Sequence, residues 1–297
     1  MAFRVAASEG ETQKRGNGHP RQLPIEESAA RSNLKFMPAE DWGWRITPEE
    51  FEAWILSRED GLLVFNKPAG VVCHPSKHGP WSSLAGAARE YLGTPKLHMP
   101  FRLDRETSGV MLLTGEEALG KRLQRAVQQG HYRKTYVALV VGRMRGRVAA
   151  ALPLGLRPSS QVRLRRGPLQ DGTGQPALTV FVPLVANDEA TLVEVLPASG
   201  RLHQIRVHAM ALGHPVFGDK IYGPDETLFM EFLEQGWTRR QQHLLSMSRH
   251  ALHCSTVEFT PNIIANKRRF SAPLANDIRE FCDKRLDLRP PAYFAFE

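Results

Sequence analysis

A single carboxylate stands between two arginines in the segment 101–110, which reads FRLDRETSGV. Arg102 precedes Asp104 by two residues, Arg105 follows it directly, and the segment closes on a Thr-Ser-Gly turn. Because a nearby cation favours the ionised form of a carboxyl group, we expect Asp104 to stay charged well below neutral pH. An ionised carboxylate can act as a nucleophile or a base. A structural ion pair would perturb the same group, so the neighbouring motifs must decide between the two interpretations.

The segment 102–109 (RLDRETSG) resembles the catalytic motif of the RluA family of RNA pseudouridine synthases, in which the Asp is essential. Further segments resemble this family's motifs in the family's order: 63–70 (LVFNKPAG) with His74-Pro75, 133–140 (RKTYVALV), 200–208 (GRLHQIRVH) with 213–219 (GHPVFGD), and 249–253 (RHALH). The resemblance spans residues 61 to 262. One departure is Phe101, where the family usually has His. A Phe can fill volume but cannot form hydrogen bonds through its side chain, so we expect repacking around the loop.

The resemblance implies that the chain isomerises a uridine within RNA to pseudouridine without a cofactor. The N1–C1′ bond breaks, and the uracil turns and rejoins through C5. Asp104 would be the catalytic carboxylate, Arg206 its ion-pair partner, and Tyr136 would stack on the uracil and help remove the C5 proton. Arg102 would fix the flipped state, because the base must leave its stack to react. The sequence leaves open whether Asp104 attacks C1′ or removes the 2′ proton to give a glycal.

The same residues bear on four other possible functions or sites. An N-glycosidase would also act on a flipped nucleotide and would release its base by hydrolysis. Retaining glycosidases use a pair of carboxylates, whereas only one is evident in this sequence, which disfavours this class. An inactive RNA-binding protein would not need Asp104, Tyr136 and Arg206 together. A P-loop at 115–121 fails because Arg122 stands where Ser or Thr must hold magnesium. The eleven histidines do not follow a zinc-binding spacing, so we predict no metal site.

The net charge of +8 points to a polyanionic partner. From Ala118 to Gln170 no Asp or Glu occurs, while that window contains twelve cations: Lys121, Arg122, Arg125, Arg133, Lys134, Arg143, Arg145, Arg147, Arg157, Arg163, Arg165 and Arg166. We predict that they form a basic surface that binds RNA phosphates in a salt-dependent way. Expected RNA contacts are Arg102, Arg163, Arg165 and Arg166, with Lys67 and His74 supporting the fold and the RNA backbone.

The elements that must position these residues are mostly strands. Runs rich in Val, Leu and aromatic residues predict strands at 62–65, 110–113, 135–141 and 192–196. Apolar spacing predicts a helix that Thr114 caps and that ends at Gly130, and further helices at 203–212 and 276–284. Strands outnumber helices without βαβ alternation, which favours an α+β fold around a mixed, mainly antiparallel sheet. The resemblance implies the pseudouridine-synthase fold, with a central active-site cleft.

We divide the chain into a disordered tail at 1–44, a short lead-in helix at 45–60 that ends near Leu56, and a catalytic domain at 61–297. No spanning apolar run or secretory signal is evident, which favours a cytoplasmic protein. The three cysteines are expected to be reduced thiols, most of them buried. We expect a monomer. Because no S4 RNA-binding module is evident, a tRNA stem-loop is favoured slightly over a large-subunit rRNA stem-loop as the partner.

Overall fold

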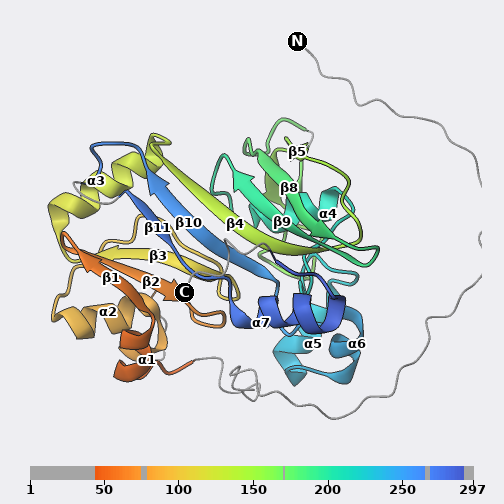
Figure 1. Cartoon of the computed structure of the whole chain (residues 1–297), viewed down its shortest axis with the longest axis horizontal. Helices are drawn as coiled ribbons and strands as arrows, with labels where there is room; N and C mark the ends of the chain where they lie inside the picture. The colour runs from red at the N-terminus through yellow and green to blue at the C-terminus, as the bar shows by residue number, and fades with distance from the viewer. Residues whose placement is uncertain (1–43, 75–78, 170, 265–267, 291–297) are drawn as a thin grey trace, which may run out of the picture. The chain divides into compact units, whose positions relative to one another are not determined.

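The computed structural model describes residues 44–74, 79–169, 171–264 and 268–290. Within these ranges one nine-stranded sheet has the order β1-β2-β3-β10-β4-β9-β8-β5, and β11 pairs with β10 (Figure 1). The strands are β1 (Ile55–Glu59), β2 (Leu62–Lys67), β3 (Ser108–Thr114), β4 (Tyr132–Val141), β5 (Val148–Ala150), β8 (Thr179–Ala186), β9 (Ala190–Pro197), β10 (Leu252–Phe259) and β11 (Arg269–Ser271). Only β3 and β10 pair in parallel in this sheet. The predicted α+β fold with a mixed, mainly antiparallel sheet is confirmed.

Seven α-helices in the described ranges accompany the sheet. They are α1 (Pro48–Ala53), α2 (Leu84–Leu92), α3 (Glu117–Gln128), α4 (Gln204–Ala211), α5 (Thr227–Gln235), α6 (Arg239–Leu245) and α7 (Asn276–Glu280), which continues as a π-helical turn at Phe281–Arg285. In Figure 1, α1 and α2 lie beside β1 and β2, α4 lies beside β8 and β9, and α5 and α6 lie together at the bottom of the view, below α4. A small second sheet joins β6 (Leu154–Leu156) to β7 (Arg166–Pro168).

The lead-in helix α1 is shorter than predicted. Thr47 and Glu50 form a capping box, with Pro48 at the start of the helix, as the sequence indicates. The helix ends at Ala53, because the following residues form β1 and pair with β2. The predicted tail at 1–44 lies outside the described residues, except for Trp44.

The P-loop-like segment starts a helix, as the apolar spacing predicts. Leu119, Leu123 and Ala126 are buried along one face of α3. Thr114 does not cap this helix. It ends β3, and its hydroxyl accepts a hydrogen bond from the backbone of Glu116, which is the N-cap residue.

The register of the central strands brings the motifs together. Gly109 of β3 pairs with Cys254 of β10, Cys254 pairs with Tyr136 of β4, and Tyr136 pairs with Val195 of β9. Gly109 has φ +113°, and a Cβ there would lie 2.2 Å from the carbonyl oxygen of Cys254. Only glycine tolerates both the dihedral angle and this approach. The loop that carries Asp104 therefore leads into β3 two strands away from Tyr136.

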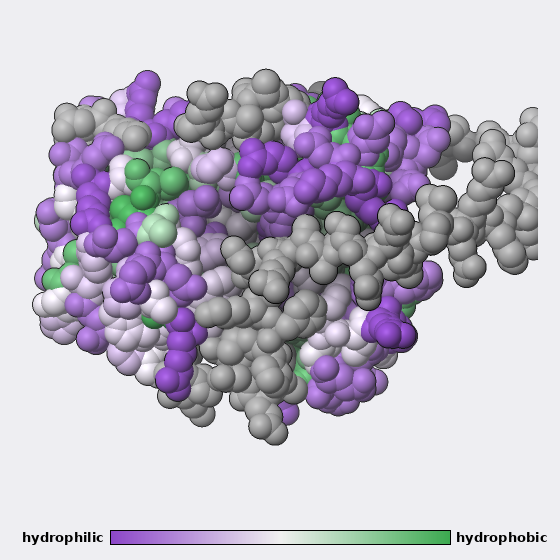
Figure 2. All heavy atoms as spheres, turned by 60° about the horizontal axis from the view of Figure 1, so that its bottom comes forward, coloured by the Kyte–Doolittle hydropathy of each residue, from purple (hydrophilic) through white to green (hydrophobic). Residues whose placement is uncertain are grey.

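The face drawn in Figure 2 is predominantly polar. Hydrophilic side chains cover most of the described surface visible in Figure 2, and hydrophobic ones form small areas. Among the described residues, no helix combines the length and apolar character that a bilayer crossing requires. All three cysteines are buried free thiols, as the sequence analysis expected for most of them.

Candidate active site

Lys67 holds the loop that carries Asp104 in place. The ammonium of Lys67 donates hydrogen bonds to the carbonyl oxygens of Pro68 (2.8 Å), Val71 (2.9 Å) and Arg105 (3.1 Å). Its side chain is fully buried, and burial lowers its pKa to about 8. The prediction that Lys67 contacts RNA is wrong, because its three donors are used within the protein. Lys67 instead ties the turn after β2 to the Asp104 loop.

Arg206 is the ion-pair partner of Asp104, as predicted. Nη1 of Arg206 donates to Oδ2 of Asp104 at 3.0 Å. The same guanidinium makes a two-point contact with Asp219, through Nε at 2.6 Å and Nη2 at 2.8 Å. Asp219 is buried and also accepts from the backbone nitrogens of Ile221 and Tyr222. This clamp fixes the direction in which Arg206 presents Nη1, and bidentate contacts of this kind are geometrically specific.

Asp104 is ionised at neutral pH. Burial would raise the pKa of Asp104, but the charges of His203 and Arg206 outweigh it and hold the pKa below its ordinary value. The pKa of His203 is itself lowered to about 4, first by burial and then by Arg206. His203 is therefore neutral near pH 7, and Arg206 is the cation that keeps Asp104 charged there. Within the described residues, Oδ1 of Asp104 has no partner and remains available to a substrate.

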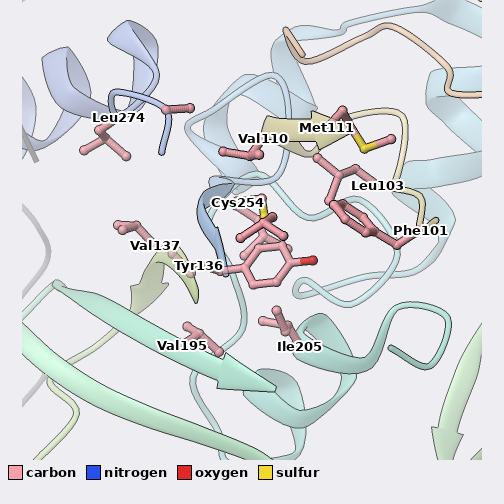
Figure 3. Close-up of a cluster of buried hydrophobic side chains, with 14 of the residues drawn as sticks. Phe101, Leu103, Val110, Met111, Tyr136, Val137, Val195, Ile205, Cys254 and Leu274 are labelled. Carbon is pink, nitrogen blue, oxygen red and sulfur yellow. The ribbon is translucent and has the colours of Figure 1, made fainter. Parts of the chain in front are cut away.

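Tyr136 lies in the same cavity as Asp104. Its ring is nearly buried, and Figure 3 shows it surrounded by Cys254, Ile205 and Phe101, with Leu103 nearby. Burial raises the pKa of Tyr136 well above its ordinary value. The phenol is therefore protonated at neutral pH, and in this state it can donate a hydrogen bond or stack on a base but is not itself a strong base.

Phe101 packs next to the loop that carries Asp104. Its ring stacks on Tyr132, with centroids 6.2 Å apart and an interplanar angle of 21°. The side chain is nearly buried beside the cleft. The position that usually holds His in the family therefore contributes an apolar wall here.

A second network supports the loop after Asp104. Glu106 accepts a hydrogen bond from Lys220 at 2.7 Å and one from the backbone nitrogen of His250 at 3.2 Å. His250 also contacts the hydroxyl of Thr107 through Nε2 at 2.8 Å. Burial would raise the pKa of Glu106, but Lys220 lowers it well below its ordinary value. These contacts fix Glu106 and Thr107, the residues that follow the Lys67 contact at Arg105.

A cleft of about 1290 Å³ contains these groups. Asp104, Tyr136 and Arg206 all line it. Three arginines that also line it have exposed side chains, namely Arg102, Arg133 and Arg201. No described residue pairs with Arg102, which leaves its guanidinium available two residues before Asp104. The cleft therefore combines one activated carboxylate with cations that can contact phosphate.

In the described part of the chain, only some of the cations in the predicted basic surface are exposed and unpaired, and so available to RNA. Arg163 is exposed and Arg166 is half-buried. Arg165 is ion-paired with Glu226, and Lys134 is buried inside the cleft. Acidic residues from outside the window thus neutralise some of its cations, which the sequence could not show.

No group of three or more His, Cys, Asp or Glu that could hold a metal ion occurs among the described residues. His208 instead contacts Thr179 and the carbonyl of Leu152, and His253 contacts Ser108. The imidazoles thus serve as buried hydrogen-bonding groups.

Residues 61–211 match the family model described as RNA pseudouridylate synthase. The chain belongs to this family. An RNA pseudouridine synthase is an isomerase, so the chain is an enzyme of that class. A Bacillus subtilis relative, the uncharacterized RNA pseudouridine synthase YjbO, is 33% identical over 82% of this chain and 80% of its own length. The ribosomal large subunit pseudouridine synthase D of Vibrio vulnificus is 29% identical over 77% of this chain and 69% of its own.

Solved structures of RNA pseudouridylate synthases share the fold. Human RNA pseudouridylate synthase domain containing 4 superimposes with a TM-score of 0.62 over 82% of this chain and 96% of its own, at 23% identity. The human domain containing 1 gives a TM-score of 0.55 over 80% and 96%, also at 23% identity. Both likenesses bear on the fold alone.

Several residues in the site of this RNA pseudouridine synthase cannot be identified from the sequence. Asp219 lies in a segment that resembles the family, yet nothing local indicates that it clamps a guanidinium 13 positions earlier. Tyr222, whose ring centroid lies 5.0 Å from the guanidinium of Arg206, has no sequence signal. The hydroxyl of Tyr222 lies 2.8 Å from Nδ1 of His203, which completes the surroundings of Arg206.

Proposed function

We propose that this enzyme isomerises a specific uridine in a structured RNA to pseudouridine and that Asp104 is its catalytic carboxylate. The observation that carries the proposal is the clamped Arg206, which keeps Asp104 ionised and leaves its Oδ1 free in the cleft. Incubation of the purified protein with RNA, followed by mapping of pseudouridine and abasic sites, tests it. Pseudouridine supports the proposal, whereas abasic sites would indicate a glycosidase, and neither product would indicate a binding protein.

The residues of the cleft suit the steps of the reaction. Arg102 at the mouth takes the place of the flipped uridine in the RNA or fixes the flipped state. Tyr136 provides a ring on which the uracil stacks. Asp104 then either bonds to C1′ through Oδ1 or removes the 2′ proton, and in both routes the N1–C1′ electron pair leaves with the uracil. Arg206 balances the charge of Asp104 without touching the base. No step requires a cofactor.

Replacing Tyr136 with Phe is expected to leave RNA binding and base detachment intact and to slow the final loss of the C5 proton. The phenol is protonated in the free enzyme, so we assign it a hydrogen-bonding role in that proton transfer. With uridine deuterated at C5, the variant should show a larger isotope effect in single turnover than the parent. Turnover by Tyr136→Phe at the parent's rate would reduce Tyr136 to a stacking platform.

Two RNA classes are candidates for the substrate. Binding through the catalytic domain and the segment 143–166 suits a compact tRNA hairpin. The names of relatives such as the ribosomal large subunit pseudouridine synthase D of Vibrio vulnificus favour large-subunit rRNA. Pseudouridine mapping of tRNA and rRNA from cells with and without the gene decides between them. A lost site confined to one class excludes the other.

The salt dependence of binding tests the basic surface. Replacing both Arg163 and Arg166 with Gln should weaken RNA binding and lower the slope of log K against log salt by about 2. Arg165 is omitted from this pair because it already contacts Glu226. Adding Arg165→Gln should change the slope little further. An unchanged slope in the double variant would remove this segment from the RNA-binding surface.

The remaining assignments extend this proposal. We assign residues 61–297 to the catalytic domain. We expect the protein to be a monomer and to be located in the cytoplasm, where RNA substrates are available. Deleting residues 1–44 should leave turnover on RNA within about twofold, because none of the groups assigned to the chemistry lies there. Size-exclusion chromatography with light scattering checks the monomer.

A further inference from the structure

Lys134 is a nearly buried residue whose ammonium has no hydrogen-bond or ion-pair partner among the described residues. It lies on β4, opposite Val257 of β10, and its exposed fraction is 8%. No described residue accepts a hydrogen bond from its ammonium or forms an ion pair with it. An ammonium carries three N–H donors and no acceptor. Lys134 lines the cleft that also contains Asp104, so these donors can be offered to a ligand bound there.

Each of the other buried lysines and arginines among the described residues has a hydrogen-bond or ion-pair partner. Lys67 donates to three carbonyl oxygens, and Lys220 contacts Glu106 and the carbonyl of Ser248. Arg206 is clamped by Asp219, and Arg249 makes a two-point contact with Asp277 at 2.7 Å for each bond. Lys134 differs from these structural cations in this one respect.

Aromatic rings surround the ammonium of Lys134. Nζ lies 5.0 Å from the ring centroid of Phe101, 5.6 Å from that of Tyr136 and 5.8 Å from that of Tyr132. Cation–π attraction stabilises the charge in part, but the rings leave its N–H donors for other acceptors. Burial lowers the pKa of Lys134, and Asp104 is one of the groups that oppose this shift. Lys134 lines the same cleft as Asp104.

We propose that Lys134 is an oxyanion-binding residue of the catalytic cleft and donates a hydrogen bond to a carbonyl oxygen of the detaching uracil. This assignment rests on the proposed function. When the N1–C1′ bond breaks, its electron pair goes to the uracil, and the negative charge spreads from N1 to O2 and O4. Lys134 keeps its proton and stabilises that charge through the hydrogen bond. Asp104 acts on the sugar, so the two residues serve opposite ends of the breaking bond.

Stacking of the base on Tyr136 would bring it beside Lys134. Stacked aromatic rings have centroids about 4.5–7 Å apart and are offset from one another. The distance from Nζ of Lys134 to the centroid of Tyr136 is 5.6 Å, so a uracil stacked with an offset on the ring face that Lys134 approaches would lie alongside the ammonium. A donor preorganised where negative charge develops stabilises the transition state more than the ground state. The unpaired state of Lys134 in the free enzyme is what such a donor requires.

The test is Lys134→Met, which removes the charge and nearly preserves the length of the side chain. The rate of uridine loss in single turnover at saturating RNA should fall roughly 10²–10³-fold, with RNA affinity within a few-fold of the parent. The variant should unfold at the same or a higher temperature, because a nearly buried side chain loses its charge and no hydrogen bond or ion pair within the described protein is broken. Lys284→Met is the matched control: Lys284 is exposed and paired with Glu280. Lys134→Gln is a second variant that also removes the charge.

A substrate with a better leaving group separates this role from others. In RNA with 5-fluorouridine at the target position, the fluorine stabilises the departing anion, so the loss caused by Lys134→Met should be smaller. The assignment would be overturned if Lys134→Met lowered the rate equally on both substrates or left it unchanged. Weaker RNA binding with an unchanged rate would also overturn it and would indicate a phosphate contact. If the parent forms no pseudouridine, the proposed function itself fails and the assignment falls with it. An active parent with an equally active variant overturns Lys134 alone.

Discussion

Asp104→Asn is expected to abolish pseudouridine formation, with single-turnover rates at least about four orders of magnitude below the parent. The amide oxygen can still accept from Nη1 of Arg206, so the local geometry should persist. The amide is neither a nucleophile for C1′ nor a base for the 2′ proton. RNA affinity should remain within a few-fold, because binding rests mainly on cations and phosphates. Single-turnover assays with mapped pseudouridine, together with filter binding, measure both quantities.

Two controls make the Asp104 result specific. Asp104→Ala excludes activity that arises from slow deamidation of Asn back to Asp. Asp283→Asn removes an exposed carboxylate outside the cleft and should leave the rate unchanged. Appreciable turnover by both Asp104 variants would take Asp104 out of its proposed role. Weakened RNA binding with a normal rate at saturation would move its role from chemistry to recognition.

The central part of the fold could be predicted because its strands are buried and rich in branched apolar residues. Every residue of β3 is buried, and the run from Val137 to Val140 of β4 has no exposed surface. The helix α2 was missed because Ala and Gly occupy four of its five buried positions, and these positions are consecutive rather than spaced at helical intervals. Gly86 is required there by packing, since a Cβ would lie 2.0 Å from the carbonyl oxygen of Pro80. Contacts of this kind depend on tertiary structure and leave no local pattern.

A site residue could be predicted where it belongs to a recognisable motif. It could not be predicted where burial in the folded structure determines the role of the side chain. The pairing of Arg206 with Asp104, 102 positions apart, followed from the family resemblance and is confirmed. Lys67 and Lys134 both appear as cations in the sequence, and both are buried in the structure. One donates to three carbonyl oxygens and the other faces aromatic rings. Neither environment can be inferred from residue type or charge count.

Asp219→Asn is expected to reduce both stability and activity strongly, although Asp219 does not face the substrate. Removing one partner of a buried, hydrogen-bonded ion pair costs about 3–5 kcal/mol. The side chain of Asp219 is fully buried and makes two contacts with Arg206. The neutral amide would also place N–H groups against those of Arg206 and free the guanidinium to turn from Asp104. Urea unfolding and single-turnover kinetics check the two effects, and Asp225→Asn, which weakens an exposed pair with Arg240, should change neither.

The pH dependence of stability gives a second readout of this clamp. Burial would raise the pKa of Asp219, but Arg206 outweighs it and holds the pKa far below its ordinary value. An acid whose pKa is depressed by folding stabilises the native state above its unfolded pKa, about 3.9 for Asp, and loses that contribution as pH falls toward the folded pKa. The difference in unfolding free energy between parent and Asp219→Asn should therefore be full at pH 6 to 7 and shrink below about pH 4. A difference that stayed constant down to pH 2 would mean that packing, rather than the charge on Asp219, holds Arg206 against Asp104.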